Sequence, residues 1–475
     1  MMRFGVSSLL FVAACHASGT SSTASAVPDA VCPVPEHPAA PSAALAIDPS
    51  SPATAGAFVL RDAVLVDGTG RAPLPDTDIF VQDGRIAGVG KDLEVPDGVT
   101  EVDARGYTVL PGFIDAHTHM VMDPPDSYAA GVERQVRETD ADRALRGVRN
   151  ARATLLAGFT TVRNVGGGMA DRALRDAIDA GLVPGPRMLV ANHSIGTTGG
   201  HCDDTNALRP EVFGEVPDFR EGIGDGPDEL RKAVRYQIKY GADVIKICAT
   251  GGVLSQGDGV GAPQLTVEEM RVIVEEAVRA ERKVAAHAHG NQGIKEAIAA
   301  GVHSIEHGSI LDDEAIAAMK RRGVFLVPTT YVGRYVVERA EAGALSPDSA
   351  RKAKEIAPKM QRSFRMAYEA GVPIALGSDA GVFPHGRNGK EFTTMVELGM
   401  KPMDAIVAGT SAAARLLGLS DVGRIVAGMR ADLVLVKGDP LEDITVLERP
   451  EAVVKDGVFV VDRTGRLSPQ GEATP

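Results

Sequence analysis

Five short segments of the chain carry the side chains best suited to chemistry. They are residues 111–119 (PGFIDAHTH), 244–246 (VIK), 286–287 (AH), 305–307 (IEH) and 377–379 (GSD). His117 and His119 are two residues apart, so in a strand both side chains point to the same face. Two neutral imidazoles on one face form half of a zinc-type site. An isolated pair is also compatible with one histidine that caps the strand and another that is solvated.

The later segments add possible partners at the ends of other apolar strands. A lone ammonium on Lys246 would face the interior at a high cost, unless it snorkels or forms an ion pair. An ammonium has no lone pair, so lysine can bind a metal only when it is modified or deprotonated. His287, His307 and Asp379 each end a strand, and each alone could be a polar strand-end residue. Together the set favours a metal site.

The segments lie in a region where short apolar strands alternate with amphipathic helices. We expect eight strands, at residues 112–117, 160–163, 187–190, 244–247, 283–286, 303–306, 325–328 and 374–377. Helices are expected between them, for example at 170–180 and at 266–281, where TVEE is a capping signal. Eight repeats of strand and helix predict an α/β fold of the (β/α)8 TIM-barrel type, in which catalytic groups gather at the carboxyl-terminal face.

Both ends of the ordered region instead resemble β-hairpins. Residues 58–66, 78–82 and 85–89 form short apolar runs, and residues 432–437 and 452–461 do the same near the other end. We therefore expect a small β-sandwich made from both ends. The predicted segments are 57–110 for its first part, 111–420 for the barrel, 421–465 for its second part and 466–475 for a tail.

The first residues have the pattern of an export signal. Arg3 precedes a short apolar run at 6–14, and VAAC at 12–15 resembles a bacterial lipobox in which Cys15 would be lipidated. Plain cleavage near Ala17 is the alternative. The run is too short to span a bilayer. Residues 16–56, rich in Ala, Ser and Pro, predict a disordered linker. We expect a periplasmic or outer-membrane lipoprotein, or a secreted protein, with membrane contact only through Cys15.

The net charge and the cysteines restrict the classes of function and of metal site that the chain can have. A net charge of −13 over 475 residues argues against nucleic-acid binding. The four cysteines do not suggest a disulfide framework or a cysteine-rich zinc site. Cys202 and Cys248 fall in different barrel segments, and Cys248, on the same strand face as Lys246, is expected to be a small packing residue that could lie near the metals.

The sequence resembles the amidohydrolase superfamily over residues 57–465. The motifs at 111–119 and 377–379, and the closing segment 424–434 (RIVAGMRADLV), carry the resemblance. Within the superfamily it is similar to the imidazolonepropionase-like branch that contains Xaa-Pro dipeptidases and carboxypeptidase-like enzymes. Imidazolonepropionase has one metal and lacks the lysine, so Lys246 favours the binuclear, peptidase-like group.

The resemblance implies a set of metal ligands. His117, His119 and Asp379 would hold one Zn²⁺ or similar divalent ion, and His287 and His307 the other. Lys246, carbamylated, would bridge the two. A hydroxide bound by both zinc ions would attack an amide carbon, with Asp379 as the proton shuttle.

The resemblance also implies substrate contacts. His201, in the glycine-containing loop 197–201, would lie near the substrate carbonyl, although it could also stabilise the loop. His289 stands where several relatives have a tyrosine that contacts substrate, so the contact with the substrate carboxylate stays open. His385 and Tyr331 are weaker candidates. His193 and His303 are expected to be structural.

Three functions remain. The first is a zinc-dependent hydrolase of dipeptides or N-acyl amino acids, prolidase-like or carboxypeptidase-like. The second is a hydrolase of cyclic amides or related heterocycles, as in imidazolonepropionase. The third is a metal-free binding or assembly protein, which the complete ligand set disfavours. Relatives commonly assemble, so a homo-oligomer is possible.

Overall fold

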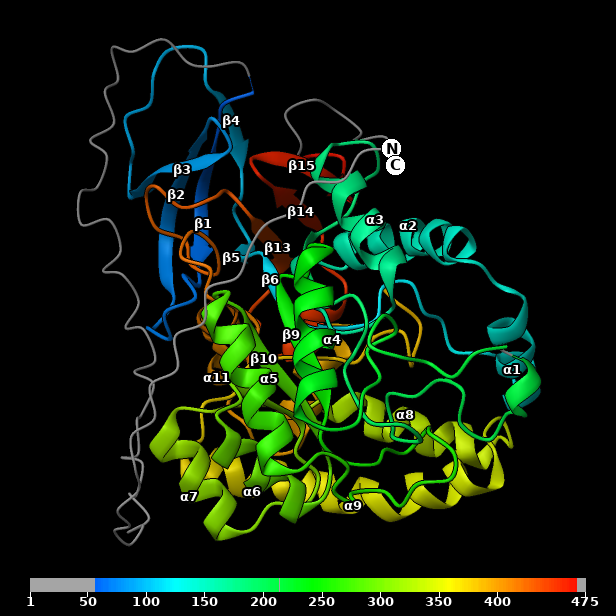
Figure 1. Ribbon diagram of the computed structural model, residues 1–475. Helices are drawn as coiled ribbons and strands as arrows, with labels where there is room; N and C mark the ends of the chain where they lie inside the picture. Colours follow the sequence, from blue (N-terminus) through cyan, green and yellow to red (C-terminus); the bar gives the residue numbers. More distant parts are fainter. Residues whose placement is uncertain (1–55, 213, 468–475) are drawn as a thin grey trace, which may run out of the picture. The chain divides into compact units, whose positions relative to one another are not determined.

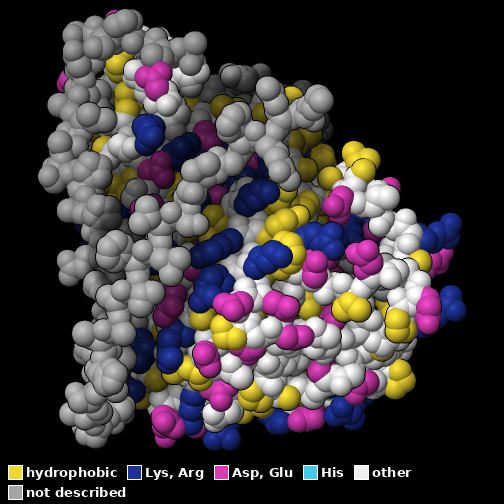
Figure 2. Space-filling view, viewed as in Figure 1, with side chains coloured by type: hydrophobic (Ala, Val, Ile, Leu, Met, Phe, Trp, Pro, Cys, Tyr) yellow, Lys and Arg dark blue, Asp and Glu magenta, His cyan; other side chains and the backbone are white. Residues whose placement is uncertain are grey.

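The computed structural model describes residues 56–212 and 214–467. The expected export signal, the Cys15 lipobox, the linker and most of the tail lie outside the described residues. Within the described ranges, no helix combines the length and apolar character needed to cross a membrane. Acidic and basic side chains are interspersed on the face shown in Figure 2.

Strands from both ends of the described chain join in one eight-stranded sheet. They are β1 (Phe58–Leu65), β2 (Leu74–Gln82), β3 (Arg85–Gly90), β4 (Thr100–Asp103), β5 (Tyr107–Pro111), β13 (Leu433–Lys437), β14 (Ala452–Lys455) and β15 (Val458–Asp462). The order is β15-β14-β13-β5-β1-β2-β3, and β4 pairs with β1. Asp83-Gly84 and Asp456-Gly457 connect hairpins with positive φ at both positions, as type I′ turns require.

This sheet encloses a core of its own, supplied by both ends of the chain. Buried side chains of β1, β2, β13 and β14 pack together with Ile425 and Met429. The rings of Phe58 and Phe459 lie 5.1 Å apart although β1 and β15 are four places apart in the sheet. The sheet therefore curls over this core, as expected for the small β-sandwich.

The middle of the chain forms the expected barrel of parallel strands. One sheet has the order β6-β7-β8, from β6 (Phe113–Thr118), β7 (Phe159–Asn164) and β8 (Arg187–Val190). The other contains β9 (Val244–Cys248), β10 (Lys283–Ala288), β11 (Ser304–His307) and β12 (Phe325–Val327). Parallel bridges between Ile195 and Ile247, Leu326 and Ile374, and Thr118 and Ala380 link these sheets and residues 374–380 in a ring.

Helices alternate with these strands and surround them (Figure 1). They are α1 (Tyr128–Arg137), α2 (Asp140–Leu156), α3 (Met169–Asp179), α4 (Pro227–Lys239), α5 (Val267–Arg279), α6 (Asn291–Ala300), α7 (Asp313–Arg322), α8 (Thr330–Glu341), α9 (Pro347–Ala370), α10 (Lys390–Glu397), α11 (Pro402–Ala408) and α12 (Ser411–Leu417), with short 3₁₀ turns at Pro210–Val212 and Ile444–Glu448. Thr266 caps α5 in a capping box with Glu269, as its sequence predicts.

The eighth barrel segment differs from the expected regular strand. Residues 374–380 are held by isolated bridges and by hydrogen bonds from Ala116 N to Leu376 O and from Asp379 N to His117 O. Asp379 has a φ of 65° there, a conformation that interrupts strand geometry. The backbone therefore turns at the residue that was predicted to reach the metals.

Candidate metal centre

The six predicted ligands line one cavity at the carboxyl ends of the barrel strands. The cavity has a volume of about 510 Å³, and its walls include His117, His119, Lys246, His287, His307 and Asp379. They come from β6 and the residue directly after it, from β9, β10 and β11, and from the segment after Leu376. Parallel strands in a barrel bring their carboxyl ends to a common face, so residues far apart in sequence meet there.

His117 and His119 present the same ring atom, Nε2, to Asp379. Asp379 Oδ1 lies 3.5 Å from His117 Nε2 and 3.3 Å from His119 Nε2. The opposite ring atoms face hydrogen-bond acceptors, because His119 Nδ1 lies 2.7 Å from the Gly166 carbonyl and His117 Nδ1 lies 2.8 Å from Glu306 Oε2. Protons on Nδ1 leave the Nε2 lone pairs directed at the cavity, as metal-ligating histidines require.

Glu306 is a supporting residue whose role the sequence analysis did not recognise. Its other oxygen, Oε1, accepts hydrogen bonds from Arg163 at 2.8 Å and from Ser304. Burial alone would raise the pKa of Glu306, but the charge of Arg163 and the bond from His117 outweigh it and hold the pKa at about 2. A permanent carboxylate beneath His117 fixes the orientation of the ring. Its position beside His307 in the sequence was the available signal.

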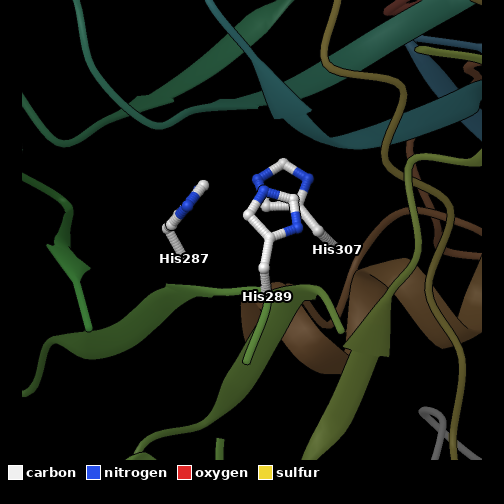
Figure 3. Close-up of side chains that lie close together, drawn as sticks. All are labelled: His287, His289 and His307. Atoms are coloured by element: carbon white, nitrogen blue, oxygen red, sulfur yellow. The ribbon is translucent and has the colours of Figure 1, made fainter. Parts of the chain in front are cut away.

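A second group consists of His287, His289 and His307 (Figure 3). One ring nitrogen from each lies within 4.8 Å of the others, and the rings of His289 and His307 are stacked 4.9 Å apart. His307 Nδ1 lies 2.8 Å from the Thr329 hydroxyl, and His289 Nδ1 lies 2.7 Å from the Ser309 hydroxyl. Burial, reinforced by neighbouring positive charge, lowers the pKa of His287 and His307 well below the usual value, so both rings are neutral.

Lys246 is buried in the wall of the same cavity. Burial lowers its pKa to about 8, although the charges of Glu306 and Asp379 act in the opposite direction. The side chain therefore gives up its proton more readily than an exposed lysine does. A neutral amine has the lone pair that both metal binding and carboxylation by CO₂ require.

Three residues at or beside the cavity have unusual backbone conformations. His307, Thr329 and Asp379 have φ values of 70°, 48° and 65°, which non-glycine residues seldom adopt. Two of them are predicted ligands, and the third is hydrogen-bonded to His307. Such conformations persist where the surrounding structure enforces them, and they commonly mark functional sites.

The donor set fits divalent metal. His287 Nε2 is buried and has no hydrogen-bond partner among the described residues. A buried nitrogen of this kind needs a partner, and a metal ion is one that fits. His117, His307 and Asp379 also have ligand atoms within 4.8 Å of each other. Neutral imidazoles with a carboxylate are typical ligands of zinc. Because His289 belongs to one group, it is also a possible ligand.

The predicted substrate contacts separate into two pairs. His201 and His289 line the cavity, and the His201 ring lies 4.1 Å from that of His287. Tyr331 and His385 do not line it. Tyr331 is buried against Phe383, with ring centroids 4.9 Å apart.

His385 is turned toward the main chain. Its Nε2 atom lies 3.3 Å from the His119 carbonyl and 3.2 Å from the Met122 carbonyl, and its Nδ1 atom lies 3.3 Å from the Thr154 hydroxyl. His385 thus supports the segment that follows His119. His303 has the structural role expected of it, since its Nδ1 accepts from the Val284 amide at 3.0 Å.

The cysteines require another correction. Cys202 and Cys248 form a disulfide between the loop after β8 and the end of β9, with Cα atoms 5.9 Å apart. This bond replaces the expected packing role of Cys248 and the expectation that the cysteines form no disulfide framework. Both residues line the cavity. The bond joins the loop of His201 to the strand of Lys246.

The barrel and its donor set define the class, a parallel α/β barrel whose carboxyl-terminal mouth carries side chains that fit a metal site. The chain matches the Amidohydrolase family over residues 108–460, and it therefore belongs to that family.

Similar proteins agree with this assignment. The chain is 34% identical to an ochratoxinase of Aspergillus niger over 414 residues, which are 83% of this chain and 84% of that protein. A crystal structure of a Xaa-Pro dipeptidase with methionine bound in its active site is 40% identical, with a TM-score of 0.81 over 85% of this chain and 99% of that one. A prolidase complexed with N-methylphosphonate-L-proline is 32% identical, with a TM-score of 0.77 over 85% and 99% of the two chains.

Proposed function

We propose that this protein is a binuclear zinc hydrolase that cleaves the amide bond of dipeptides or N-acyl amino acids. The observation that carries the proposal is the position of Asp379, whose Oδ1 faces the Nε2 atoms of both His117 and His119. A carboxylate placed there can serve as a ligand and can accept a proton from an attacking water. Binding-only proteins have no need of such a group.

The ligands divide between two ions. His117, His119 and Asp379 would hold one, His287 and His307 the other, and Lys246 would bridge them as a carbamate. Ions bound there would polarise the amide carbonyl and lower the pKa of water. The low polarity that shifts the pKa of Lys246 also favours the neutral amine that reacts with CO₂.

Asp379 has the central part in the proton transfers. Burial alone would raise its pKa, but the neighbouring histidines and Lys246 keep it below the usual value, so the carboxylate is ionised. It takes a proton from the attacking water and passes it to the departing nitrogen, which needs that proton to leave as an amine. His201, in the same cavity, contacts the substrate beside the scissile bond.

The walls of the cavity favour a substrate with an apolar part and a free carboxylate. Val332 and Val336 of α8 and Ile356 and Met360 of α9 form an apolar side. Arg143 of α2 also lines the cavity, and within residues 56–212 and 214–467 its guanidinium has no ion-pair partner. Such an arginine is available to a carboxylate, as the C-terminus of a dipeptide or N-acyl amino acid provides. The dipeptidase and ochratoxinase relatives support the same substrate class.

A paired substrate library tests this function. The substrates would be dipeptides (among them Xaa-Pro compounds), N-acyl amino acids and ochratoxin, each assayed with zinc and bicarbonate. Each peptide would be compared with the same peptide carrying a C-terminal amide. We expect turnover of the free acids, weaker turnover of the amides, and a kcat lowered by about 10²–10⁴-fold in Asp379→Asn. Turnover of cyclic amides alone would replace this proposal with the imidazolonepropionase-like alternative.

We also propose that the protein is exported and anchored through Cys15, on the basis of its first 15 residues. Metabolic labelling of the full chain with an alkyne fatty acid should give a signal that Cys15→Ser abolishes. Release of the unlabelled protein into the periplasm or medium would instead support simple cleavage.

A further inference from the structure

The loop that carries His201 is held in place from several directions. Its next residue, Cys202, is bonded to Cys248, two positions beyond Lys246 on β9. The His201 amide donates to Gln264 Oε1 at 2.9 Å. The ring lies directly against Gly252, where a Cβ atom would collide with it. A histidine held this closely has a defined orientation toward the cavity.

The ring itself is held through Ser255. His201 Nδ1 lies 2.8 Å from Ser255 Oγ, which lies 2.9 and 2.8 Å from the two oxygens of Asp258. A carboxylate has no proton to give, so the single hydroxyl proton of Ser255 goes to Asp258. Ser255 must then accept from His201 Nδ1–H. In the neutral ring this leaves the lone pair on Nε2, the atom that is not used by Ser255.

Asp258 is in turn fixed by a buried lysine. Lys352 of α9 is fully buried, and its Nζ lies 2.8 Å from Asp258 Oδ1 and 3.0 Å from the Ser255 carbonyl. Asp258 also accepts from the Gly252 amide and the Gln264 side chain, each at 3.2 Å. Burying an ammonium is costly unless its hydrogen bonds are satisfied, and Lys352 satisfies them with Asp258, the Ser255 and Gly252 carbonyls and Asp348 of its own helix.

We propose that Ser255, Asp258 and Lys352 are positioning residues that orient His201, present its Nε2 atom to the substrate and, with the Cys202–Cys248 disulfide, prevent the loop from moving. This inference rests on the proposed hydrolase function. The Nε2 lone pair accepts a hydrogen bond from bound substrate. The alternative is that the network only stabilises the loops after β8 and β9, without acting through the imidazole.

A double-mutant cycle separates the two roles. Ser255→Ala should lower kcat about 10- to 100-fold with little change in KM, because small displacements of a positioned group reduce rates by such factors. Ser255→Thr, which keeps the hydroxyl, should recover most of the rate. In a His201→Ala background, Ser255→Ala should have no further effect. An equal loss in both backgrounds would overturn the proposal.

A matched control removes a buried hydroxyl far from the cavity. Thr108 of β5 donates to the Gly438 carbonyl at 2.6 Å, in the eight-stranded sheet. Thr108→Val should leave kcat and KM unchanged. The double variant Cys202→Ala/Cys248→Ala should lower kcat in the wild-type background and not in His201→Ala.

A spectroscopic measurement on the metal-free protein does not depend on turnover. With ¹⁵N-labelled histidine, the His201 signals, assigned with His201→Ala, should show a proton on Nδ1 and none on Nε2. Ser255→Ala should change this pattern. Unchanged His201 signals in Ser255→Ala would contradict the positioning role. The wild type could cleave no amide and still show the expected His201 signals and their change in Ser255→Ala. In that case the proposed hydrolase function would be wrong, whereas the orientation of His201 by Ser255 would be supported.

Discussion

Glu306 and His117 are joined by a 2.8 Å hydrogen bond that crosses the barrel interior from β11 to β6. These strands are not neighbours in the ring of strands, so the bond connects parts of the barrel that main-chain pairing leaves separate. Arg163 of β7 completes the connection through Glu306 Oε1. The interior of the barrel thus fixes one ligand histidine by a charged network.

Glu306→Gln tests the importance of that network. Removing the charge weakens the hold on the His117 ring and leaves Arg163 without its ion pair. We expect zinc affinity to fall by about 10- to 100-fold, the usual effect of losing such a partner, as measured by competition with a chelator. Glu276→Gln, at an exposed pair with Arg235 on α4, is the control and should bind zinc normally. Equal affinities in both variants would contradict the role of Glu306.

Asp379→Asn tests the proton transfers. An amide keeps an oxygen for the metal but cannot shuttle protons, so most metal should stay bound while kcat falls by about 10²–10⁴-fold. Metal analysis and initial rates on the same sample measure both. Asp228→Asn, at an exposed position of α4, should leave both the metal content and kcat unchanged. Rates near wild type in Asp379→Asn would show that another group carries the proton.

That the six proposed ligands line one cavity could be predicted because each stands at or near the end of an apolar strand, and strand ends converge in a barrel. The supporting residues could not. In the sequence Glu306 resembles any other strand residue, because its supporting role depends on contacts with Arg163 and His117, which lie on other strands. Cys202 and Cys248 are 46 residues apart, and nothing local indicates that their loops meet.

His385 and Tyr331 lie outside the lining of the cavity, a placement that their positions in the sequence do not reveal. Both follow barrel strands, and loops at that face usually carry specificity. Whether a loop side chain enters the cavity depends on the exact path of the backbone. Here His385 contacts main-chain carbonyls and Tyr331 packs against Phe383.

The buried carboxyl of Glu391 predicts a pH effect on stability. Burial raises its pKa from 4.5 to about 8, despite bonds from the Thr330 and Tyr331 amides. The folded protein therefore holds this proton to a higher pH than the unfolded chain does. The contribution of Glu391 to the free energy of unfolding is fully present below pH 4.5. It is lost as the pH rises toward 8, by up to about 1.4 kcal/mol per pH unit.

Glu391→Gln removes this titration. Thermal melts of the metal-free proteins between pH 5 and 9 should show the variant gaining stability relative to wild type as the pH rises. Parallel curves for the two proteins would show that Glu391 does not hold a proton in the folded state.

The disulfide can be observed directly. In protein purified without reductant, Cys202 and Cys248 should resist alkylation under denaturing conditions until they are reduced, as peptide mass spectrometry would show. Cys202→Ala/Cys248→Ala should lower the free energy of unfolding by about 2–4 kcal/mol, through the greater freedom of the unfolded chain. Free thiols at both positions in the folded, oxidised protein would contradict the assignment.

The most direct test of the account is the metal content of the folded protein measured together with its activity. Zinc bound per chain would be counted by mass spectrometry after purification and again after chelation and reconstitution with zinc and bicarbonate. We expect about two zinc ions per chain, as binuclear hydrolases hold, with amide hydrolysis that disappears on chelation and returns with the metal. A folded protein that binds no metal, or that hydrolyses amides equally well without it, would contradict the central claim.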